Sequence, residues 1–269
     1  MKLSMSTLGC PDWDFPTILQ KYSALGADGI EVRVLEGHVE ACDIPHFAAE
    51  NRNATFNVLK DHGLELSCFG ASTNFHGSDE DTMRMIEAAK TTIDTCSAMK
   101  IPFIRVFGDR ITSPEAEETA IRKAGEGIKE LCTYARGKNV GILMEVHGDY
   151  NTPNRLLKVA KIAGSPEFGI LWDIEHSDKV FGDDIEAFYR PLAHLVRHIH
   201  VKNHIRLGDG RFQLCSIDEG DIPVPAIVAA LEKDGFAGYF SYEWEKKWHP
   251  ELADAQEEFP RYCAYMRAL

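Results

Sequence analysis

Short runs of β-branched and other apolar residues alternate along the chain with longer segments whose apolar positions recur at helical spacing. The alternation occurs eight times. The short runs predict strands over residues 2–7, 29–34, 65–70, 103–107, 141–147, 168–172, 197–202 and 239–243. The longer segments predict helices over residues 14–25, 45–62, 79–99, 114–137, 153–163, 183–195, 223–234 and 251–268.

Capping and turn residues fall where this pattern needs them. Ser78 precedes three acidic residues, which is typical of a helix N-terminus because carboxylates there face the positive end of the helix dipole. Pro114 follows a serine and suits the first position of a helix. Gly26, Gly63 and Gly235 each stand between a predicted helix and the next strand, where glycine commonly ends a helix.

The repeat length indicates the fold class. Dividing the 269 residues among eight units gives about 34 residues each, which suits one strand–helix repeat of a (β/α)₈ barrel. We therefore predict an α/β protein, a single-domain (β/α)₈ TIM barrel over residues 1–269. The competing architecture, a two-domain doubly wound sheet, requires a glycine-rich phosphate loop after an early strand. The nearest segment, MSTLGCPDWD, has one glycine and no G-x-G-x-x-G pattern.

Composition and charge narrow the function. Hydrophobic residues make up 44% of the chain and charged residues 26%, which excludes a disordered chain, a collagen-like repeat and a disulfide scaffold. The formal net charge of −13 repels phosphate backbones and gives no polybasic membrane contact. We therefore expect a small-molecule substrate and neither nucleic acid nor a membrane as partner.

The cysteines and the N-terminus suggest a compartment. The seven cysteines are scattered without a C-x-x-C pair, as expected of reduced thiols packed as small apolar residues. The segment MKLSMSTLGC has too short an apolar stretch for a signal peptide, and no run approaches the ~18 apolar residues of a membrane span. These features predict a cytoplasmic location.

Charged residues and histidines gather at the ends of the last four predicted strands, although barrel strands should be mostly apolar. These residues are Glu145 and His147, Asp173 and His176, His198, His200, Lys202 and His204, and Glu243 and Glu245. The C-terminal ends of the strands form the rim that bears the active site in this fold. We therefore expect the active site among these residues.

One residue from each of these four strand ends can point into the barrel, because residues alternate between faces along a strand. The candidates are Glu145, Asp173, His200 and Glu243. Three carboxylates and one imidazole at one point require a cation, since otherwise they repel one another or lose solvation. Oxygen-rich ligands favour Mn²⁺ or Mg²⁺, with Zn²⁺ or Co²⁺ as alternatives. Singly, Asp173 could be a helix cap, His200 a core histidine, and Glu243 a loop residue.

The order and spacing of these motifs resemble the xylose-isomerase-like TIM-barrel superfamily, and within it the sugar phosphate isomerase/epimerase group. The resemblance spans the chain through the segments GADGIEVR, MEVHGDY, LWDIEH, HIHVKNH and GYFSYEWE. It implies that the four candidates are the Glu/Asp/His/Glu metal set of that superfamily.

The resemblance also implies substrate contacts. In the ketose 3-epimerases, a histidine three residues after the metal aspartate and an arginine six residues after the metal histidine bind substrate. His176 and Arg206 match these positions. Asn151 stands where those epimerases have a second glutamate, which is a departure. The segment MEVHGDY, in which His147 stands two residues after the first metal glutamate, is more similar to the corresponding segments of the dehydratases and of uncharacterised isomerase/epimerase members.

Most enzymes of this superfamily remove a proton from the carbon next to a carbonyl, and a metal acting as a Lewis acid stabilises the enediolate that forms. Glu145 and Glu243 are expected to be the catalytic bases, one removing the proton and the other returning one. Return to the opposite face gives an epimer, return to the adjacent carbon gives an isomer, and loss of a β-hydroxyl gives a dehydration product. The expected activity is therefore that of a sugar isomerase or epimerase, with a keto-sugar or keto-inositol dehydratase as the alternative.

Further residues are candidates for binding substrate. His176 and Arg206 are expected to hold substrate oxygens. Lys202 either adds a positive charge there or pairs with a neighbouring acid, and His147 either holds substrate or supports Glu145. The absence of a dense Arg/Lys cluster gives no support to a phosphorylated substrate.

Loop residues have two interpretations each. The side chains of Trp13, Phe75, His76 and Trp248 lie in loops predicted above the mouth, where they either face a sugar or pack ordinarily. Glu31 and Arg33, at the end of the second strand, form either an ion pair or a substrate contact.

Two other functions are compatible with the same fold. An apurinic-endonuclease-type phosphodiesterase needs several more histidine ligands and a basic face for DNA, and the net charge of −13 argues against it. A non-catalytic sugar-binding barrel would not need two bases. The resemblance also implies a homo-oligomer.

Overall fold

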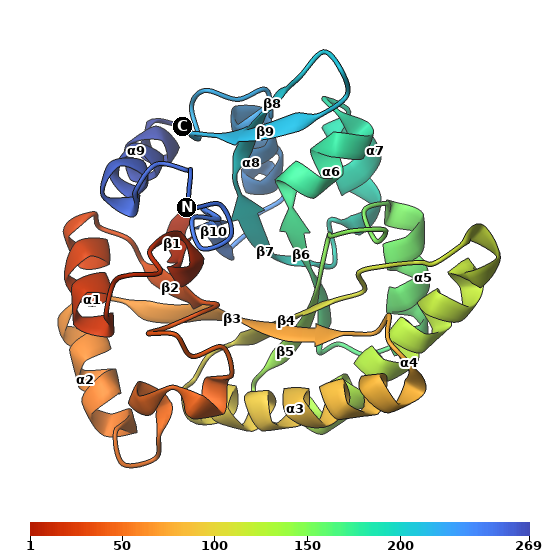
Figure 1. The fold of residues 1–269 in the computed structure, drawn as a ribbon, viewed down its shortest axis with the longest axis horizontal. Helices are drawn as coiled ribbons and strands as arrows, with labels where there is room; N and C mark the ends of the chain where they lie inside the picture. Colours follow the sequence, from red (N-terminus) through yellow and green to blue (C-terminus); the bar gives the residue numbers. More distant parts are fainter.

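Eight parallel strands close into a barrel in the computed structural model, which describes residues 1–269 (Figure 1). The strands are β1 (Lys2–Ser6), β2 (Gly29–Val32), β3 (Glu65–Asn74), β4 (Phe103–Phe107), β5 (Gly141–Glu145), β6 (Phe168–Asp173), β7 (Val196–Val201) and β10 (Tyr239–Tyr242). Neighbours in the ring follow the order β1, β10, β7, β6, β5, β4, β3, β2, and β2 pairs with β1 to close it. The predicted single TIM barrel is confirmed.

Helices form an outer layer around the strands (Figure 1). They are α1 (Phe15–Ala24), α2 (Arg52–Asp61), α3 (Asp79–Ala98), α4 (Glu117–Ala135), α5 (Pro153–Ala163), α6 (Ile174–Phe181), α7 (Ile185–Leu192), α8 (Val224–Lys233) and α9 (Ala255–Ala268). Short 3₁₀ turns are η1 (Thr7–Gly9), η2 (Ala41–Asp43), η3 (Pro45–Phe47) and η4 (Pro114–Ala116). Ser78 caps α3 as expected, in a reciprocal capping box with Asp81. No helix has both the length and the apolar character needed to cross a lipid bilayer.

The strands are buried along almost their whole length, whereas each helix buries one stripe. On α4, the buried stripe includes Ile121, Ala124, Ile128 and Leu131, at the spacing of one helical face. The helical stripes pack on the outside of the barrel, so one continuous core of 66 buried residues joins the two layers. The strand ends are thereby held rigidly, which is what a site built from several of them requires.

Two predicted helices differ from the structure. The helix predicted over 45–62 begins only at Arg52, and the segment before it forms the η2 and η3 turns. Ile44, between the two turns, and Phe47, at the end of η3, are buried three residues apart, which is also a spacing found on one face of an α-helix. The helix predicted over 183–195 is shorter, and a separate helix, α6, precedes it directly after β6.

An antiparallel hairpin that the sequence analysis missed follows β7. Its strands are β8 (Asn203–Arg206) and β9 (Phe212–Cys215), which lie beside α6 at the C-terminal end of the barrel (Figure 1). The Asn203 side chain anchors the hairpin, because its amide donates to the carbonyl of Ile217 and its oxygen accepts from the amide of Ile222. The hairpin brings further side chains over the barrel mouth.

Candidate metal centre

Four strand ends converge inside the barrel mouth. Glu145 ends β5, Asp173 ends β6, His200 lies near the end of β7, and Glu243 directly follows β10. All four side chains are buried, and one ligand atom of each lies within 4.8 Å of the others. From His200 Nδ1, the distances to carboxylate oxygens are 3.4 Å to Glu145, 3.8 Å to Asp173 and 3.2 Å to Glu243.

Strand register explains the convergence. Asp173 is the direct neighbour of His200 in the β6–β7 ladder, and the amide of Glu243 donates to the carbonyl of Val201, which continues the β10–β7 pairing. Asp173 is also a helix cap: its Oδ1 accepts the amides at the start of α6, while its Oδ2 faces the other three side chains. Both sequence interpretations of Asp173 therefore hold, one for each oxygen.

Three atoms of this cluster are buried without a hydrogen-bond partner. They are Glu145 Oε2, Asp173 Oδ2 and His200 Nδ1. Glu145 Oε2 and Asp173 Oδ2 have ion-pair partners only, at 2.9 Å each, whereas His200 Nδ1 faces carboxylate oxygens alone. Such a concentration of buried carboxylates around one ring nitrogen fits a bound divalent cation. The donor set of three carboxylates and one imidazole suits a divalent ion such as Mn²⁺, Mg²⁺, Zn²⁺ or Co²⁺.

Two buried cationic side chains flank the cluster. Lys202 Nζ lies 2.9 Å from Asp173, 2.5 Å from Glu243 and 2.6 Å from a third carboxylate, Glu245. Of the two roles considered for Lys202, the structure therefore contains the ion pair. Arg105 Nε lies 2.9 Å from Glu145 Oε2, and its guanidinium stacks on an aromatic ring. These cations keep the carboxylates ionised.

The pKa values follow from this arrangement. Burial alone would raise the pKa of Glu145, but Arg105 and His200 outweigh it and hold that pKa below its ordinary value. Burial likewise opposes ionisation of Glu243, and His200 and Lys202 hold its pKa below the ordinary value. Both glutamates are therefore charged at neutral pH.

A cavity of about 660 Å³ opens beside the cluster. Its wall includes His147, His176 and Glu245, and the hairpin covers it with apolar side chains such as Phe212 and Leu214. The rings of His147 and His176 lie 4.4 Å apart, centre to centre. A cavity of this size suits a small-molecule ligand.

A family model now identifies the architecture, since the description "Xylose isomerase-like TIM barrel" matches residues 19–265. The chain belongs to this family. No curated protein sequence matches the chain. The family therefore supplies the fold, and the chemistry must be argued from the site.

Several solved structures superpose on almost the whole chain at low sequence identity. One is the probable 3-DHS dehydratase AsbF of Bacillus anthracis, at 18% identity and a TM-score of 0.81, covering 100% of this chain and 99% of that one. A zinc-bound IOLI protein is 17% identical with a TM-score of 0.79, covering 99% of this chain and 96% of that one. D-psicose 3-epimerase is 17% identical with a TM-score of 0.76, covering 99% of this chain and 98% of that one. These similarities establish the fold that the chain shares with them.

Asp109, which the sequence analysis did not single out, lies behind the histidines of the cavity. Its oxygens face His76 Nδ1 at 3.2 Å and His147 Nδ1 at 3.5 Å. Gly148 makes this approach possible, since a Cβ there would lie 2.5 Å from the Asp109 carbonyl and its φ is +55°. The contact places a carboxylate near His147 Nδ1, at a distance longer than that of an ordinary hydrogen bond.

His176 is half-buried in the wall of the cavity. Burial is the main reason that its pKa lies below the ordinary value, and nearby Lys202 and His147 contribute in the same direction. The ring is therefore neutral at pH 7, so one nitrogen can donate a hydrogen bond and the other can accept one.

Arg206 lies outside the cluster. Its guanidinium pairs with Asp178 at 2.6 Å and with Asp183 at 2.8 Å, and its side chain is 34% exposed. His204, on the same hairpin strand, is buried between Glu175 and Asp178. The structure therefore places Arg206 in a second ionic network next to the cavity.

The predicted loop residues separate into core and surface. Phe75 is buried, Trp13 packs edge-on against Phe259, and Trp248 is exposed. Of these loop residues, only His76 reaches the histidines of the cavity wall through Asp109. Ordinary packing therefore accounts for the aromatic residues Trp13 and Phe75.

Glu31 and Arg33 do not pair with each other. Glu31 binds His198 and His200, whereas Arg33 donates to the Ser72 hydroxyl. The ion-pair interpretation of these two residues is wrong. A signal for the role of Glu31 was present, because a charged residue inside the apolar strand GIEV needs a buried partner.

Proposed function

We propose that this protein is a divalent-metal-dependent sugar isomerase or epimerase that removes a proton next to the carbonyl of a ketose or related keto-polyol. The observation that supports it most is the buried convergence of three carboxylates and one imidazole near a cavity sized for a small molecule. The D-psicose 3-epimerase structure has the same fold, which makes this chemistry compatible with the barrel.

The residues proposed to hold the metal are Glu145, Asp173, His200 and Glu243. Mn²⁺ or Mg²⁺ suits the three carboxylates best, with Zn²⁺ or Co²⁺ as alternatives. A bound divalent ion would act as a Lewis acid on the carbonyl and hydroxyl oxygens of the substrate.

Glu145 and Glu243 are proposed as the catalytic bases. Their carboxylates come from strands on opposite sides of β6 and β7 in the ring, so they approach a substrate from two directions. One takes the proton from the carbon next to the carbonyl, and the other returns a proton to the enediolate. Ionisation of both glutamates, maintained by Arg105, His200 and Lys202, supports this assignment.

Four side chains are proposed to bind substrate. His147 and His176 face the cavity and offer imidazole nitrogens to substrate hydroxyls. Lys202 supports the negative charge of the enediolate from its place among the carboxylates. Arg206 contacts substrate by exchanging the exposed Asp183 for a substrate oxygen.

A second candidate is a dehydratase of a keto-sugar or keto-inositol. The pairing of His147 with Asp109 favours it, because a carboxylate-supported imidazole can protonate a leaving hydroxyl while a glutamate removes the neighbouring proton. The dehydratase AsbF has the same fold. Both candidates share the first proton transfer and differ only in whether water leaves.

The proposal also covers partners and location. The net charge of −13 makes nucleic acid a poor partner, so a phosphodiesterase of the apurinic-endonuclease type is the weakest alternative. The seven cysteines are unpaired, which supports a reducing, cytoplasmic location. A homo-oligomer follows only from the family resemblance.

The test is solvent exchange with the metal-loaded enzyme. Candidate ketoses and keto-polyols are incubated in D₂O with Mn²⁺ or Mg²⁺ and followed by NMR and mass spectrometry. Deuterium entering next to the carbonyl without loss of water supports the isomerase or epimerase. Net loss of water supports the dehydratase. Absence of exchange across ketoses and keto-inositols would contradict both.

A further inference from the structure

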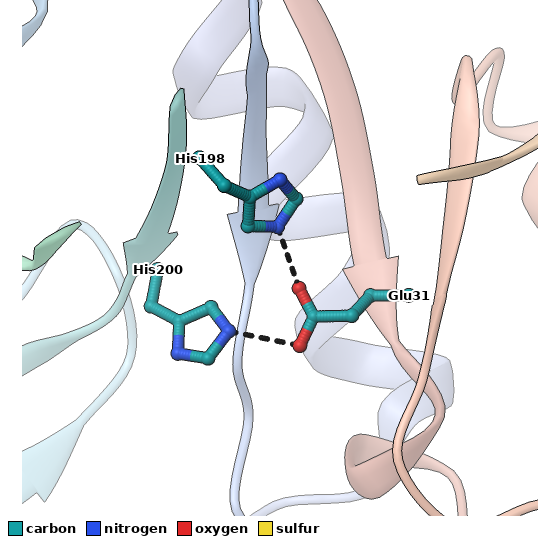
Figure 2. Close-up of side chains that lie close together, drawn as sticks. All are labelled: Glu31, His198 and His200. Carbon is teal, nitrogen blue, oxygen red and sulfur yellow. Dashed lines mark hydrogen bonds and ion pairs between the residues drawn. The ribbon is translucent and has the colours of Figure 1, made fainter. Parts of the chain in front are cut away.

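The carboxylate of Glu31 joins the two inward-facing histidines of β7 (Figure 2). Its Oε2 lies 2.7 Å from His198 Nε2, and its Oε1 lies 2.8 Å from His200 Nε2. The side chains of all three are 0–1% exposed. Glu31 belongs to β2, which is separated from β7 in the ring by β1 and β10, so the contact crosses the barrel interior.

These three residues also have the composition of a metal site. Their geometry is that of hydrogen bonds, because each oxygen of Glu31 lies at hydrogen-bond distance from one Nε2. An ion placed between them would need distances of about 2 Å to each atom and would force the groups apart. Both Nε2 atoms therefore carry hydrogens and donate to Glu31.

Donation from Nε2 determines what His200 presents to the metal centre. A metal ion binds the neutral ring, in which only one nitrogen carries hydrogen, so donation from Nε2 leaves Nδ1 as the atom with the lone pair. Figure 2 shows this second nitrogen directed away from Glu31. It is the same Nδ1 that faces the oxygens of Glu145, Asp173 and Glu243 without a hydrogen-bond partner.

We propose that Glu31 is a positioning residue of the metal centre, fixing His200 in the Nε2–H tautomer with Nδ1 aimed at the ion. His198 completes the device by occupying the second oxygen of Glu31, so that the carboxylate cannot rotate away from His200. The inference rests on the proposed function in one respect, which is that the four-residue cluster binds a metal ion.

The experiment measures Mn²⁺ binding to the metal-stripped full chain by calorimetry. In Glu31→Gln, the side chain keeps its shape but only one of its two terminal atoms accepts a hydrogen bond, so two imidazole donors compete for it. We expect Mn²⁺ affinity to fall about 10- to 100-fold, as is usual when the partner of a metal-ligating histidine is lost.

Glu258→Gln is the matched control. Glu258 is a buried carboxylate on α9 that accepts from the hydroxyls of Ser216 and Tyr242, away from the cluster. The Glu258→Gln substitution makes the same chemical change at another buried carboxylate that has two hydrogen-bond partners. We expect its Mn²⁺ affinity to stay within about threefold of wild type. Thermal unfolding in EDTA compares the stability of the two variants.

The double variant Glu31→Gln/His198→Leu separates positioning from general damage. Removing the competing donor leaves the remaining amide oxygen to His200 alone, so the double variant should bind Mn²⁺ several-fold more tightly than Glu31→Gln. A purely structural role predicts the opposite, since a second core substitution adds damage.

The outcomes are distinguishable. Loss of affinity in Glu31→Gln alone, with recovery in the double variant, supports the positioning role. Unchanged affinity in Glu31→Gln, an equal loss in Glu258→Gln, or no recovery overturns it while leaving the metal centre intact. Failure of the wild-type chain to bind Mn²⁺ overturns the metal centre and the positioning role together.

Discussion

Two buried histidines, four residues apart in the chain, lie among carboxylates in different ways. His204 is saturated: its Nδ1 lies 3.1 Å from Glu175 and its Nε2 lies 2.8 Å from Asp178. Arg206 balances the second of these carboxylates. At His200, by contrast, Nδ1 faces three carboxylates and has no hydrogen-bond partner. Buried charge is common to both clusters, and the histidine of the second has a ring nitrogen without a hydrogen-bond partner.

This difference distinguishes a closed ionic network from a candidate binding site. The His204 network ties the β8–β9 hairpin to α6, and every group in it has a partner within the protein. The His200 cluster gathers three carboxylates around a ring nitrogen that has no hydrogen-bond partner, which fits the proposed metal ion. The predictions below test whether the two clusters differ in function as they do in saturation.

The largest expected effect is on turnover. Glu145→Gln and Glu243→Gln should each slow proton exchange by about a thousandfold or more, because each removes a proposed base and a metal ligand. Deuterium incorporation under single-turnover conditions measures the rate, with Glu258→Gln as the folded control. Near-normal exchange in either glutamate variant would remove that residue from the proposed catalytic pair.

The second-largest expected effect is on the free energy of unfolding, when the network around His204 is changed. Asp178→Asn removes the buried carboxylate that His204 and Arg206 share and leaves them Glu175 and the exposed Asp183, so the free energy of unfolding should fall by on the order of 2 kcal/mol. Urea denaturation monitored by circular dichroism measures it. Mn²⁺ affinity should stay within about threefold of wild type. A large loss of Mn²⁺ binding would show that the two clusters are not separate.

A smaller effect concerns pH. Burial would lower the pKa of His200, but Glu243, Glu31 and Glu145 hold it well above its ordinary value in the ion-free protein. His200 is therefore protonated at neutral pH, and an ion must displace that proton. Mn²⁺ affinity should rise up to tenfold per pH unit between about pH 6 and 8. Calorimetry in buffers of different ionisation enthalpy should detect the released proton, and a pH-independent affinity would contradict this assignment.

The raised pKa of His200 also makes the stability of the ion-free protein depend on pH, in the direction opposite to that of Mn²⁺ affinity. Because the folded pKa of His200 is raised, its contribution is fully present below its unfolded pKa of about 6.5. That contribution is lost as pH rises through the folded value. Stability of the metal-stripped chain should therefore decline with rising pH in this range, in the direction opposite to metal affinity.

The smallest effect is expected at Arg206. Arg206→Gln removes the guanidinium and should raise KM about three- to tenfold with kcat nearly unchanged. The reason is that Arg206, once its pair with Asp183 opens, is proposed to bind the substrate equally well in the ground state and in the transition state. Steady-state kinetics with the substrate found by solvent exchange measures both constants. An unchanged KM would assign Arg206 wholly to the His204 network.

The barrel could be predicted from the sequence because strand and helix periods repeat eight times with helix-ending glycines between them. The helix predicted over 45–62 was wrong in its first part because the 3₁₀ turns bury residues three apart, as a helix does. The β8–β9 hairpin was missed although Asp209-Gly210 is a typical hairpin turn, since its strands lie outside the repeating pattern.

The convergence of the four side chains could be predicted because they end strands that must meet at one rim. The partners of those side chains could not be predicted in the same way. Arg105 comes from β4, the neighbour of the strand that bears Glu145, whereas Glu31 comes from β2 and its contact with His200 on β7 crosses the barrel interior. Only closure of the ring brings such residues together, and no spacing along the chain encodes it.

The most direct test is a crystal structure of the chain soaked in Mn²⁺, with anomalous diffraction collected at the manganese edge. We predict one strong peak at about 2.0–2.3 Å from His200 Nδ1 and from oxygens of Glu145, Asp173 and Glu243. His204 should have no peak beside it. A cluster without a peak, or with Lys202 still bridging its carboxylates in saturating Mn²⁺, would contradict the account.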